Sequence, residues 1–468
     1  MNRQAGREAG RYSSKKEPGN IYRAFRLSEV MVLPVTSLLL LSFALAWAVV
    51  FDGGVRPHDW YTTLLTLGCS SSAYWVFTRR IDRAPPLQTW LRCLIVLLPC
   101  YIIFQLVPFP IEVLRILSPA RSDLLRALLP IVPGVTSAPL SVNPPAAVLN
   151  LFAILGYTAT FLLVRELSWR LSARPWILAI PLIVIAAFEA GLGMFQVFAN
   201  WPSGSATGTY VNYDHFAGFL EMILPFAIVC GLAILRNKNF STFSAIAACA
   251  LWAIAALQLL AIFYSLSRAG FLATLFVLFT VGALSIGRRI PSRAWRGALL
   301  GTIGSAIVLI MIFLPPNQLI QRFAAISPNE NMSADSRLLL WKETLPVISE
   351  YRMFGCGLGG FESVFLKHQT VEVSSIAEFA HNDYLQYLAE LGAVGFIIFA
   401  GILTGILFQI LRGIVGLVDE ERRLLVIACA ATFVGILLHS FVDFNMYIPA
   451  NAMTLAWIAG IGSANALD

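Results

Sequence analysis

The chain has 468 residues, of which 58% are hydrophobic and 13% are charged, and its mean hydropathy is +0.74. No soluble core needs that much apolar surface, so the composition excludes a soluble enzyme and predicts an all-α, polytopic membrane protein. Lys and Arg exceed Asp and Glu by only 33 to 26. Because no basic stripe with interleaved aromatic residues is present either, we expect no nucleic-acid partner.

Cysteine and histidine are placed in ways that favour neither disulfides nor a metal site. Six of the seven cysteines lie within apolar runs, and Cys356 stands alone in a polar segment. The five histidines are scattered, and no two aspartates lie two residues apart, as a metal-nucleotide glycosyltransferase site needs. We therefore expect no disulfide framework, no metal and no cofactor.

The chain begins with a basic tail, residues 1–29, which carries seven Lys and Arg residues. The apolar run that follows, from 30 to about 50, is too long for the core of a signal peptide, so we interpret it as a retained signal anchor with a cytoplasmic tail. Further apolar runs predict about twelve transmembrane helices with both termini inside, at about 60–78, 92–109, 146–164, 175–198, 216–235, 242–264, 270–287, 298–314, 392–411, 424–442 and 449–465.

These runs divide the chain into four parts. After the tail, residues 30–314 are predicted to form transmembrane helices 1 to 9 and residues 392–468 helices 10 to 12. Between them, residues 315–391 contain no apolar run long enough to cross a bilayer. We predict that this segment is a structured periplasmic loop that carries the catalytic residues.

The distribution of positive charge supports this topology, because Lys and Arg accumulate in cytoplasmic loops. In the predicted arrangement, 23 of the 33 Lys and Arg residues lie inside. The ten outside cations are therefore exceptions, and we expect some of them to have a function. Arg268 is one of them, in the tight connection Ser265–Gly270 at the outer mouth of the bundle.

A second exported segment, Pro108–Ala146, is rich in proline and is predicted to contain a short amphipathic helix at Arg121–Leu129.

Two outside arginines have the chemistry of an anion site. Arg337 follows a predicted helix N-cap at Asp335, so a cation lies in a first turn where it opposes the helix dipole, which indicates a bound anion. Together with Arg268 it could clamp a diphosphate through bidentate hydrogen bonds. The alternatives are that Arg268 only reaches the lipid headgroups and that Arg337 is a solvated or salt-bridged surface charge.

Residues 380–392 predict an amphipathic helix that begins near His381 and carries this histidine in its first turn. The helix dipole disfavours an imidazolium there, so His381 is expected to stay neutral and to accept a proton. The sequence thus indicates a general base at His381, against the alternative of a histidine that is merely hydrogen-bonded at the interface. If His381 is not the base, Asp383 or Glu378 is the next candidate.

Three other features have simpler interpretations. The glycine-rich stretch Gly355–Glu362 has no strand before it and is predicted to be a turn after a helix that ends near Phe354, rather than a phosphate-binding loop. Glu189 and Glu221 fall inside predicted spans, where a charge is costly and often functional, although a hydrogen bond to a neighbouring helix would explain either one.

Six short motifs in this order resemble the O-antigen ligase and polymerase superfamily over roughly residues 146 to 465. They are Gly208-Thr-Tyr-Val-Asn212-Tyr-Asp-His215-Phe-Ala-Gly218, Ser267-Arg268-Ala-Gly270, Ser336-Arg337 with Trp341, Gly355-Cys-Gly-Leu-Gly-Gly-Phe-Glu362, Ala380-His381-Asn382 with Glu390 and Gly392, and His439-Ser-Phe-Val-Asp443-Phe444. Where family members often have Asn-Arg-Asn-His, this chain has Asn212-Tyr-Asp-His215, so no role is transferred to an arginine at position 213.

The resemblance implies a metal-independent, inverting glycosyltransferase on the periplasmic face of a bacterial inner membrane. Its donor would be a glycan on undecaprenyl diphosphate, and its acceptor a hydroxyl of lipid A-core or a similar molecule. By matching positions, Arg268 and Arg337 would bind the diphosphate, and His381 would take the proton of the acceptor hydroxyl. Secondary candidates are Asn212, His215, Glu221, Asn382, Asp383, Glu390 and Asp443.

Three alternatives remain open. An O-antigen or exopolysaccharide polymerase would use the same donor. A polytopic transporter or flippase would use Glu189, Glu221 and Arg268 along a pathway at the membrane midplane, although no internal repeat is visible. A structural scaffold would leave the charged loop residues dispensable.

Overall fold

The computed structural model describes residues 19–78, 83–201, 204–236, 241–286, 334–370 and 377–466, together with the isolated positions 304, 317 and 319. Most of the basic tail (residues 1–18), most of the predicted ninth span (298–314) and the first part of the predicted loop lie outside the described residues. From Gly19 onward, the predicted tail is helical and continuous with the first apolar run.

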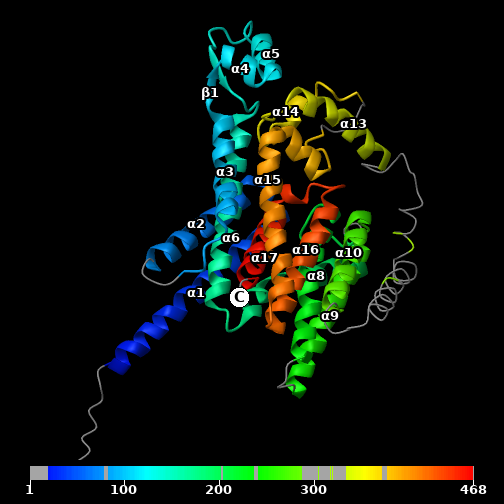
Figure 1. Ribbon diagram of the computed structural model, residues 1–468. Helices are drawn as coiled ribbons and strands as arrows, with labels where there is room; N and C mark the ends of the chain where they lie inside the picture. Colours follow the sequence, from blue (N-terminus) through cyan, green and yellow to red (C-terminus); the bar gives the residue numbers. More distant parts are fainter. Residues whose placement is uncertain are drawn as a thin grey trace, which may run out of the picture.

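The fold is an α-helical bundle whose long helices contain most of each predicted apolar run within the described residues, although α1 and α15 begin well before the runs at 30 and 392 (Figure 1). They are α1 (Gly19–Val50), α2 (Pro57–Phe77), α3 (Thr89–Leu106), α6 (Pro144–Arg170), α7 (Ile180–Ala199), α8 (Tyr213–Arg236), α9 (Thr242–Tyr264), α10 (Arg268–Ile286), α15 (Asp383–Gly416), α16 (Glu420–His439) and α17 (Pro449–Asn465). Short 3-10 helices lie at Asp52–Gly54 (η1), Pro175–Leu178 (η2) and Asn445–Tyr447 (η3).

Within the described residues, nine of these helices are long and apolar enough to cross a membrane. The helices α2 and α17 occupy the second and twelfth predicted spans but are not among the nine, and α17 has only 17 residues. The prediction of a multi-pass helical membrane protein is confirmed. The count of twelve spans stays a prediction.

Local chemistry explains where several helices begin. The side chain of Asn143 caps α6, whose first residue is Pro144, and Asn382 accepts hydrogen bonds from the first turn of α15. Such caps satisfy backbone N–H groups that have no partner inside the helix. Between their ends the helices satisfy their own backbone hydrogen bonds, which a chain inside a bilayer requires.

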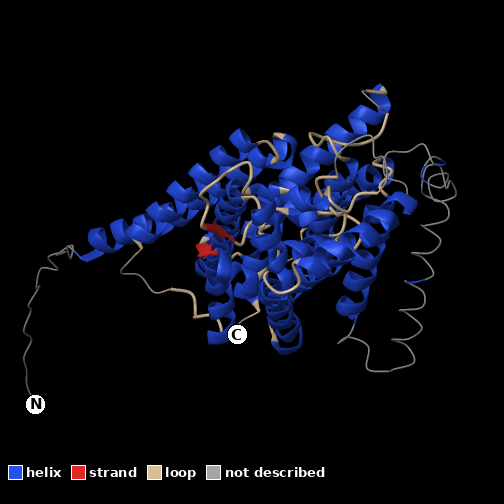
Figure 2. Cartoon of the chain, turned by 90° about the horizontal axis from the view of Figure 1, so that it is seen from above, coloured by secondary structure: helices blue, strands red, loops and turns tan. Residues whose placement is uncertain are grey.

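The core lies around α8 and α16, the two membrane helices with the largest buried share. The helix α16 packs on α8, α10 and α17, and α17 packs along α6. Outer helices instead expose large apolar side chains, as α7 does with Phe188, Phe195 and Phe198, which is the arrangement expected for contact with lipid. Seen from above, α1 runs out to one side of this bundle (Figure 2).

Smaller elements gather at one end of the bundle (Figure 1). They are β1 (Pro108–Pro110), α4 (Ile111–Leu117), α5 (Pro119–Leu128), β2 (Ser137–Pro139), α13 (Ala334–Glu350) and α14 (Phe361–Phe365). The antiparallel pair β1–β2 is a small departure from the all-α prediction, whereas α5 confirms the helix predicted at Arg121–Leu129. Both segments predicted to be exported thus lie at the same end, opposite the C-terminus.

Two predicted helix starts are wrong. The helix α13 already contains Asp335, so this residue is not the N-cap, although Arg337 still lies close to the described start of the helix. The helix α15 begins at Asp383, with Asn382 as its cap, so His381 precedes the helix instead of lying in its first turn. The cause is the asparagine, whose side-chain oxygen caps the helix while the histidine backbone turns away from it with φ +47°.

The boundary predicted between residues 391 and 392 coincides with a kink in α15 at Gly392, where φ is +63°. The turn around Gly355 passes directly over this kink, and a Cβ atom at Gly355 would lie only 2.0 Å from the backbone oxygen of Glu390. Only glycine allows such a close approach at a positive φ. These glycines therefore fix the polar segment against the membrane part of α15.

We expect the end that carries α13 and α14 to face outward, because the predicted inside loops hold most of the Lys and Arg residues. The predicted outer loop can be tested at Leu366 and the predicted inner connection between α15 and α16 at Val418, because these side chains are 51% and 93% exposed. In a variant without cysteines, a membrane-impermeant maleimide should label Leu366→Cys but not Val418→Cys in spheroplasts. Labelling of Val418→Cys alone would contradict the topology.

Candidate active site

Polar side chains from six segments meet at the end of the bundle that carries α13 and α14. The segments are the starts of α8, α10, α13 and α15, the end of α16, and the connection between α16 and α17. They come from residues far apart in sequence, which the packing of α8, α10, α15 and α16 brings together.

His381 lies at the edge of this site, held by its backbone. The indole Nε1 of Trp341, on α13, donates hydrogen bonds to the carbonyl oxygens of Ala380 and His381, at 3.0 and 3.4 Å. The side chain of His381 is 20% exposed, and its Nδ1 lies 3.6 Å from Oδ1 of Asp443. His381 is therefore oriented by a carboxylate, with part of its ring accessible. Because His381 precedes the cap of α15, the helix dipole acts on its imidazole less directly than predicted.

Asp443 is fully buried at the centre of three histidines. Besides His381, Nε2 of His215 lies 3.7 Å and Nε2 of His439 lies 3.9 Å from Oδ2 of Asp443. The ring of Phe444 contacts His215 and His381 edge-on, with 4.7 Å between ring centres in both cases. One carboxylate thus faces three imidazoles, and an aromatic ring separates two of them.

The electrostatics favour an ionised Asp443. Burial raises the pKa of a carboxyl group, but attraction to the positively charged forms of His215, His439 and His381 outweighs it and holds the pKa of Asp443 below its usual range. Asp443 is therefore available as a carboxylate at neutral pH.

A second carboxylate, Asp214, contacts Arg337 and the residue that precedes Arg268. Its Oδ2 lies 3.1 Å from Nη2 of Arg337, and its Oδ1 accepts a hydrogen bond of 2.5 Å from the hydroxyl of Ser267, the residue before Arg268. Arg337 is thus salt-bridged, as the alternative interpretation had it, but to a buried group of the site. Sequence reasoning missed Asp214 and Ser267, although both lie in the quoted motifs.

The secondary candidates Asn212 and Asn382 cap helices next to the reactive groups. Asn212 accepts a hydrogen bond from the backbone N–H of Asp214 at 2.8 Å, and its amide nitrogen lies 3.5 Å from Nε2 of His215. Asn382 accepts from the N–H groups of Tyr384 and Leu385. Both residues position their neighbours.

Asp383 and Glu390 have structural contacts. One oxygen of Asp383 accepts hydrogen bonds from the hydroxyl of Ser440 at 2.7 Å and from the N–H of Met446 at 3.2 Å. The carboxylate of Glu390 accepts from the N–H groups of Gly359 and Phe361, and also from Gln386 and Tyr447. The glycine-rich stretch is indeed a turn, and Glu390 holds it in place. The other base candidate, Glu378, is exposed.

Both intramembrane glutamates have partners in neighbouring segments. Glu189 accepts hydrogen bonds from the N–H and the hydroxyl of Thr209, at 2.9 and 2.8 Å. Oε1 of Glu221 lies 3.1 Å from Nδ1 of His439, and both side chains are fully buried. Glu221 therefore extends the histidine cluster into the bundle, while Glu189 anchors the connection before α8. His439 is a further residue of the site that sequence reasoning had ranked low.

The described residues contain no group of three or more His, Cys, Asp or Glu side chains arranged to hold a metal ion. In the cluster around Asp443, several buried atoms, among them Nδ1 of His381, Oδ1 of Asp443 and Nε of Arg337, have no hydrogen-bond partner among the described residues. Such atoms are costly when left unpaired, which is typical of a site that binds a polar ligand.

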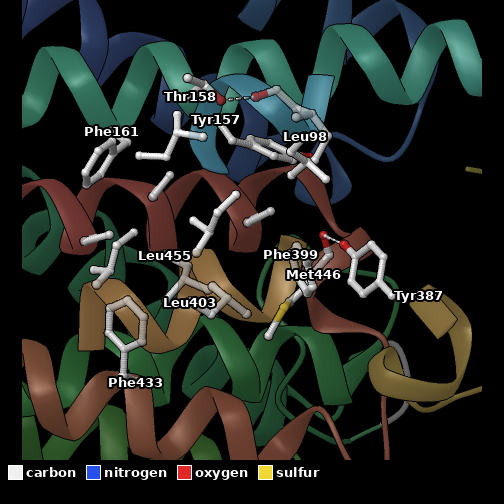
Figure 3. Close-up of a pocket in the computed structure, with 17 residues that line it drawn as sticks. Leu98, Tyr157, Thr158, Phe161, Tyr387, Phe399, Leu403, Phe433, Met446 and Leu455 are labelled. Atoms are coloured by element: carbon white, nitrogen blue, oxygen red, sulfur yellow. Dashed lines mark hydrogen bonds between the residues drawn. The ribbon is translucent and has the colours of Figure 1, made fainter. Parts of the chain in front are cut away.

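An apolar cavity of about 120 Å³ lies beside the site, between α3 and α6 on one side and α15 and α17 on the other (Figure 3). Phe161, Phe399, Leu403 and Leu455 are among the residues that line it. Tyr387 closes the end nearest the polar cluster, and its hydroxyl donates to the carbonyl of Met446 at 3.4 Å.

The fold and the site define a helical multi-pass membrane protein with a charged, histidine-containing site at one end of its bundle. Residues 253–400 match the family model described as O-antigen ligase, which confirms the resemblance to the O-antigen ligase and polymerase superfamily over this range. The matched range contains Arg268, Arg337 and His381. It is shorter than the range 146–465 over which motifs resemble the family, so the motifs around Asp214 and Asp443 lie outside it. No curated protein matches the chain.

Asp443→Asn should lower the midpoint of thermal unfolding in detergent, because the three imidazoles lose their common counter-charge. We expect a cost of about 1 to 3 kcal/mol. A carboxyl group whose pKa is depressed by folding contributes stability above its unfolded pKa of about 3.9, and this contribution is lost as the pH falls through the lower folded value. The part of the deficit that comes from the carboxylate should thus be lost as the pH falls below about 4.

The matched control is Asp123→Asn. The side chain of Asp123 is 74% exposed and makes only a long contact with Arg126, so little change in the unfolding midpoint is expected. A deficit of Asp443→Asn that disappears near pH 6 would mean that this carboxyl group titrates close to neutrality.

Proposed function

We propose that the protein is a ligase-type glycosyltransferase that moves a glycan from undecaprenyl diphosphate to the hydroxyl of an acceptor, lipid A-core or a similar molecule. The reaction would take place on the outer face of the bacterial inner membrane and would be inverting and independent of metal. The family match supports a lipid-linked glycan substrate and a glycan acceptor.

The observation that carries this proposal is the joint position of a base and two arginines. The pair of His381 and Asp443 lies at the same end of the bundle as Arg337 and as Arg268, which begins α10. Asp214 forms an ion pair with Arg337, and the next residue, His215, faces Asp443. Base and cations therefore belong to one connected site.

In the proposed step, the acceptor oxygen attacks the anomeric carbon of the donor sugar from the face opposite the diphosphate. The new carbon–oxygen bond forms as the bond to the diphosphate breaks, and the hydroxyl proton passes to His381. Because Nδ1 of His381 faces Asp443, a proton on Nδ1 leaves Nε2 free to accept the new one. Asp443 stabilises the imidazolium that results.

The arginines would bind the leaving diphosphate. Negative charge grows on its bridging oxygen during the step, and a fixed guanidinium stabilises this charge without reorganisation. Asp214 holds Arg337 in position before the donor binds. The apolar cavity of Figure 3 lies between membrane helices and, with a volume of about 120 Å³, could take in only a short part of the donor's lipid chain.

Arg268→Ala, Arg337→Ala and His381→Ala should each abolish measurable transfer while the protein stays folded and inserted. A general base contributes roughly 10² to 10⁴-fold in rate, and a charge-stabilising donor a similar factor. Arg337→Lys should also fail, since an ammonium does not replace a bidentate guanidinium. The measurement is glycan transfer in membranes, with protein amount and unfolding temperature checked for each variant.

Arg115→Ala is the control, because this exposed arginine lies on α4 at the same end of the bundle but outside the site. Near-normal transfer by His381→Ala would refute the base assignment. Because the carboxylate of Asp383 is engaged, Glu378 would then be tested first.

The acceptor separates the ligase from the polymerase, since both use the same donor, base and arginines. Purified protein is incubated with undecaprenyl diphosphate-linked repeats, with and without lipid A-core. We expect product only when lipid A-core is present, because the motifs match ligase-type members without gaps. A ladder of repeats without added acceptor would indicate a polymerase, and lipid crossing the bilayer without any transfer would indicate a transporter or flippase.

A further inference from the structure

A cleft of about 720 Å³ lies at the outer end of the protein, away from the histidine cluster. One wall comes from α4 and α5, and the other from the end of α13, the turn after it and α14. The volume is within the range of about 300 to 1,000 Å³ that is typical of ligand sites. None of the residues that line it takes part in the proposed reaction.

The polar lining consists of hydroxyl groups and balanced charges. Three serines, Ser118, Ser349 and Ser363, line the cleft, together with two acidic and two basic side chains, Asp123, Glu350, Arg352 and Lys367. Glu350 and Lys367 pair with each other at 2.6 Å. A cleft with no net charge does not favour a phosphate or another anion. Serine hydroxyls both donate and accept hydrogen bonds, as the hydroxyls of a sugar do.

One of these hydroxyls lacks a partner. Ser118 is only 5% exposed, and its hydroxyl has no hydrogen-bond partner among the described residues. A buried hydroxyl without a partner costs free energy, and this one lies in the wall of the cleft. It is therefore positioned to bond a hydroxyl group of a ligand.

The rest of the lining is apolar and exposed. Leu124 and Met353, from opposite walls, are 37% and 49% exposed, and Phe354 and Val364 lie between the polar groups. Sugar rings have apolar C–H faces besides their hydroxyl groups. A mixed lining of this kind fits an oligosaccharide better than a purely polar or a purely apolar ligand.

The helix α13 connects the cleft to the candidate active site. Arg337 lies near its start and Glu350 at its end, and a rise of 1.5 Å per residue separates the two by about 20 Å. The cleft is therefore too far away to hold the reacting atoms. It is close enough to hold sugars further along the same glycan.

We propose that this cleft is a binding site for an oligosaccharide, namely the sugars of a substrate glycan that lie several residues from the reacting end. The identity of the glycan rests on the proposed function. The site would select substrates by glycan structure and length, separately from the diphosphate and the base.

Direct binding is tested with full-length protein in nanodiscs and two lipid-free probes. One probe is the repeat-unit oligosaccharide from the surface polysaccharide of the bacterium that encodes the chain, and the other is its core oligosaccharide. Saturation-transfer NMR should show contact with one of them, which tells whether the donor or the acceptor glycan occupies the cleft. Binding of neither probe would overturn the proposal.

Two variants place the binding in the cleft. Ser363→Trp and Ser349→Trp each put a large ring into the lining, and both should abolish the NMR signal. In transfer assays both variants should raise KM for the matching substrate by about tenfold, while kcat stays close to that of the unchanged protein. The reason is that they lose only binding that the substrate and the transition state share equally. The control is Leu366→Trp, which alters an exposed neighbour that does not line the cleft.

The outcomes separate this proposal from the proposed function. If Arg337→Ala and His381→Ala lose transfer but the two tryptophan variants keep the normal KM and the NMR signal, the cleft proposal fails and the function stands. If the unchanged protein transfers no glycan but binds a probe in a way that Ser363→Trp abolishes, the cleft stands and the proposed reaction fails. If one tryptophan variant does not fold, the other one decides.

Discussion

The structure depends on one buried carboxylate, that of Asp443. Placing a charge in the interior of a membrane protein is costly unless partners surround it. Here the partners are three imidazoles from the start of α8, the segment before α15 and the end of α16. These three chain segments must meet for the charge to be compensated, so folding of the outer end and assembly of the site are one requirement.

Hydrogen bonds also fix the backbone around Asp443. The N–H group that opens α15, at Asp383, donates to the carbonyl oxygens of Ser440 and Asp443, and the Asp383 side chain returns to the hydroxyl of Ser440. Asn445 bonds the Asp443 carboxylate, and Asn451 bonds Asn445 and the backbone of His215. A short connection between two helices is thereby fixed to the starts of two others. This rigidity is what a base needs when its geometry decides the rate.

Two adjacent residues of α8 contact different parts of the site. Asp214 faces Arg337 and Ser267, and His215 faces Asp443. The start of one helix thus joins the part of the site that contains Arg337 to the part that contains Asp443 and its histidines. The residue before Asp214 is Tyr213, so the start of α8 adds no arginine to this part of the site.

The sequence was sufficient to predict most of the helices and to place Arg268, Arg337 and His381 at one end of the bundle, because long apolar runs and outside cations are strong local signals. It was not sufficient for Asp214, which pairs with a residue 123 positions away, nor for the arrangement of three histidines about Asp443, which packing alone creates. The helix start at His381 was missed because Asn382 is the better cap. The cleft between α5 and α13 could not be predicted either, since its two walls belong to segments with no shared motif.

The same contacts bear on whether the bundle could serve as a transport pathway. A pathway needs polar groups that can be released to a solute, yet Glu189 is bonded to Thr209 and Glu221 to His439. At the opposite end, Arg165 donates to the carbonyl of Pro85 and the hydroxyl of Ser463, and Arg423 donates to the carbonyls of Leu284 and Ile414. These arginines tie neighbouring segments together at that end of the bundle. Buried atoms without a partner among the described residues gather around His381, Asp443 and Arg337, at the end that carries α13 and α14, although Oε2 of Glu221 and the hydroxyl of Ser285 also lack one.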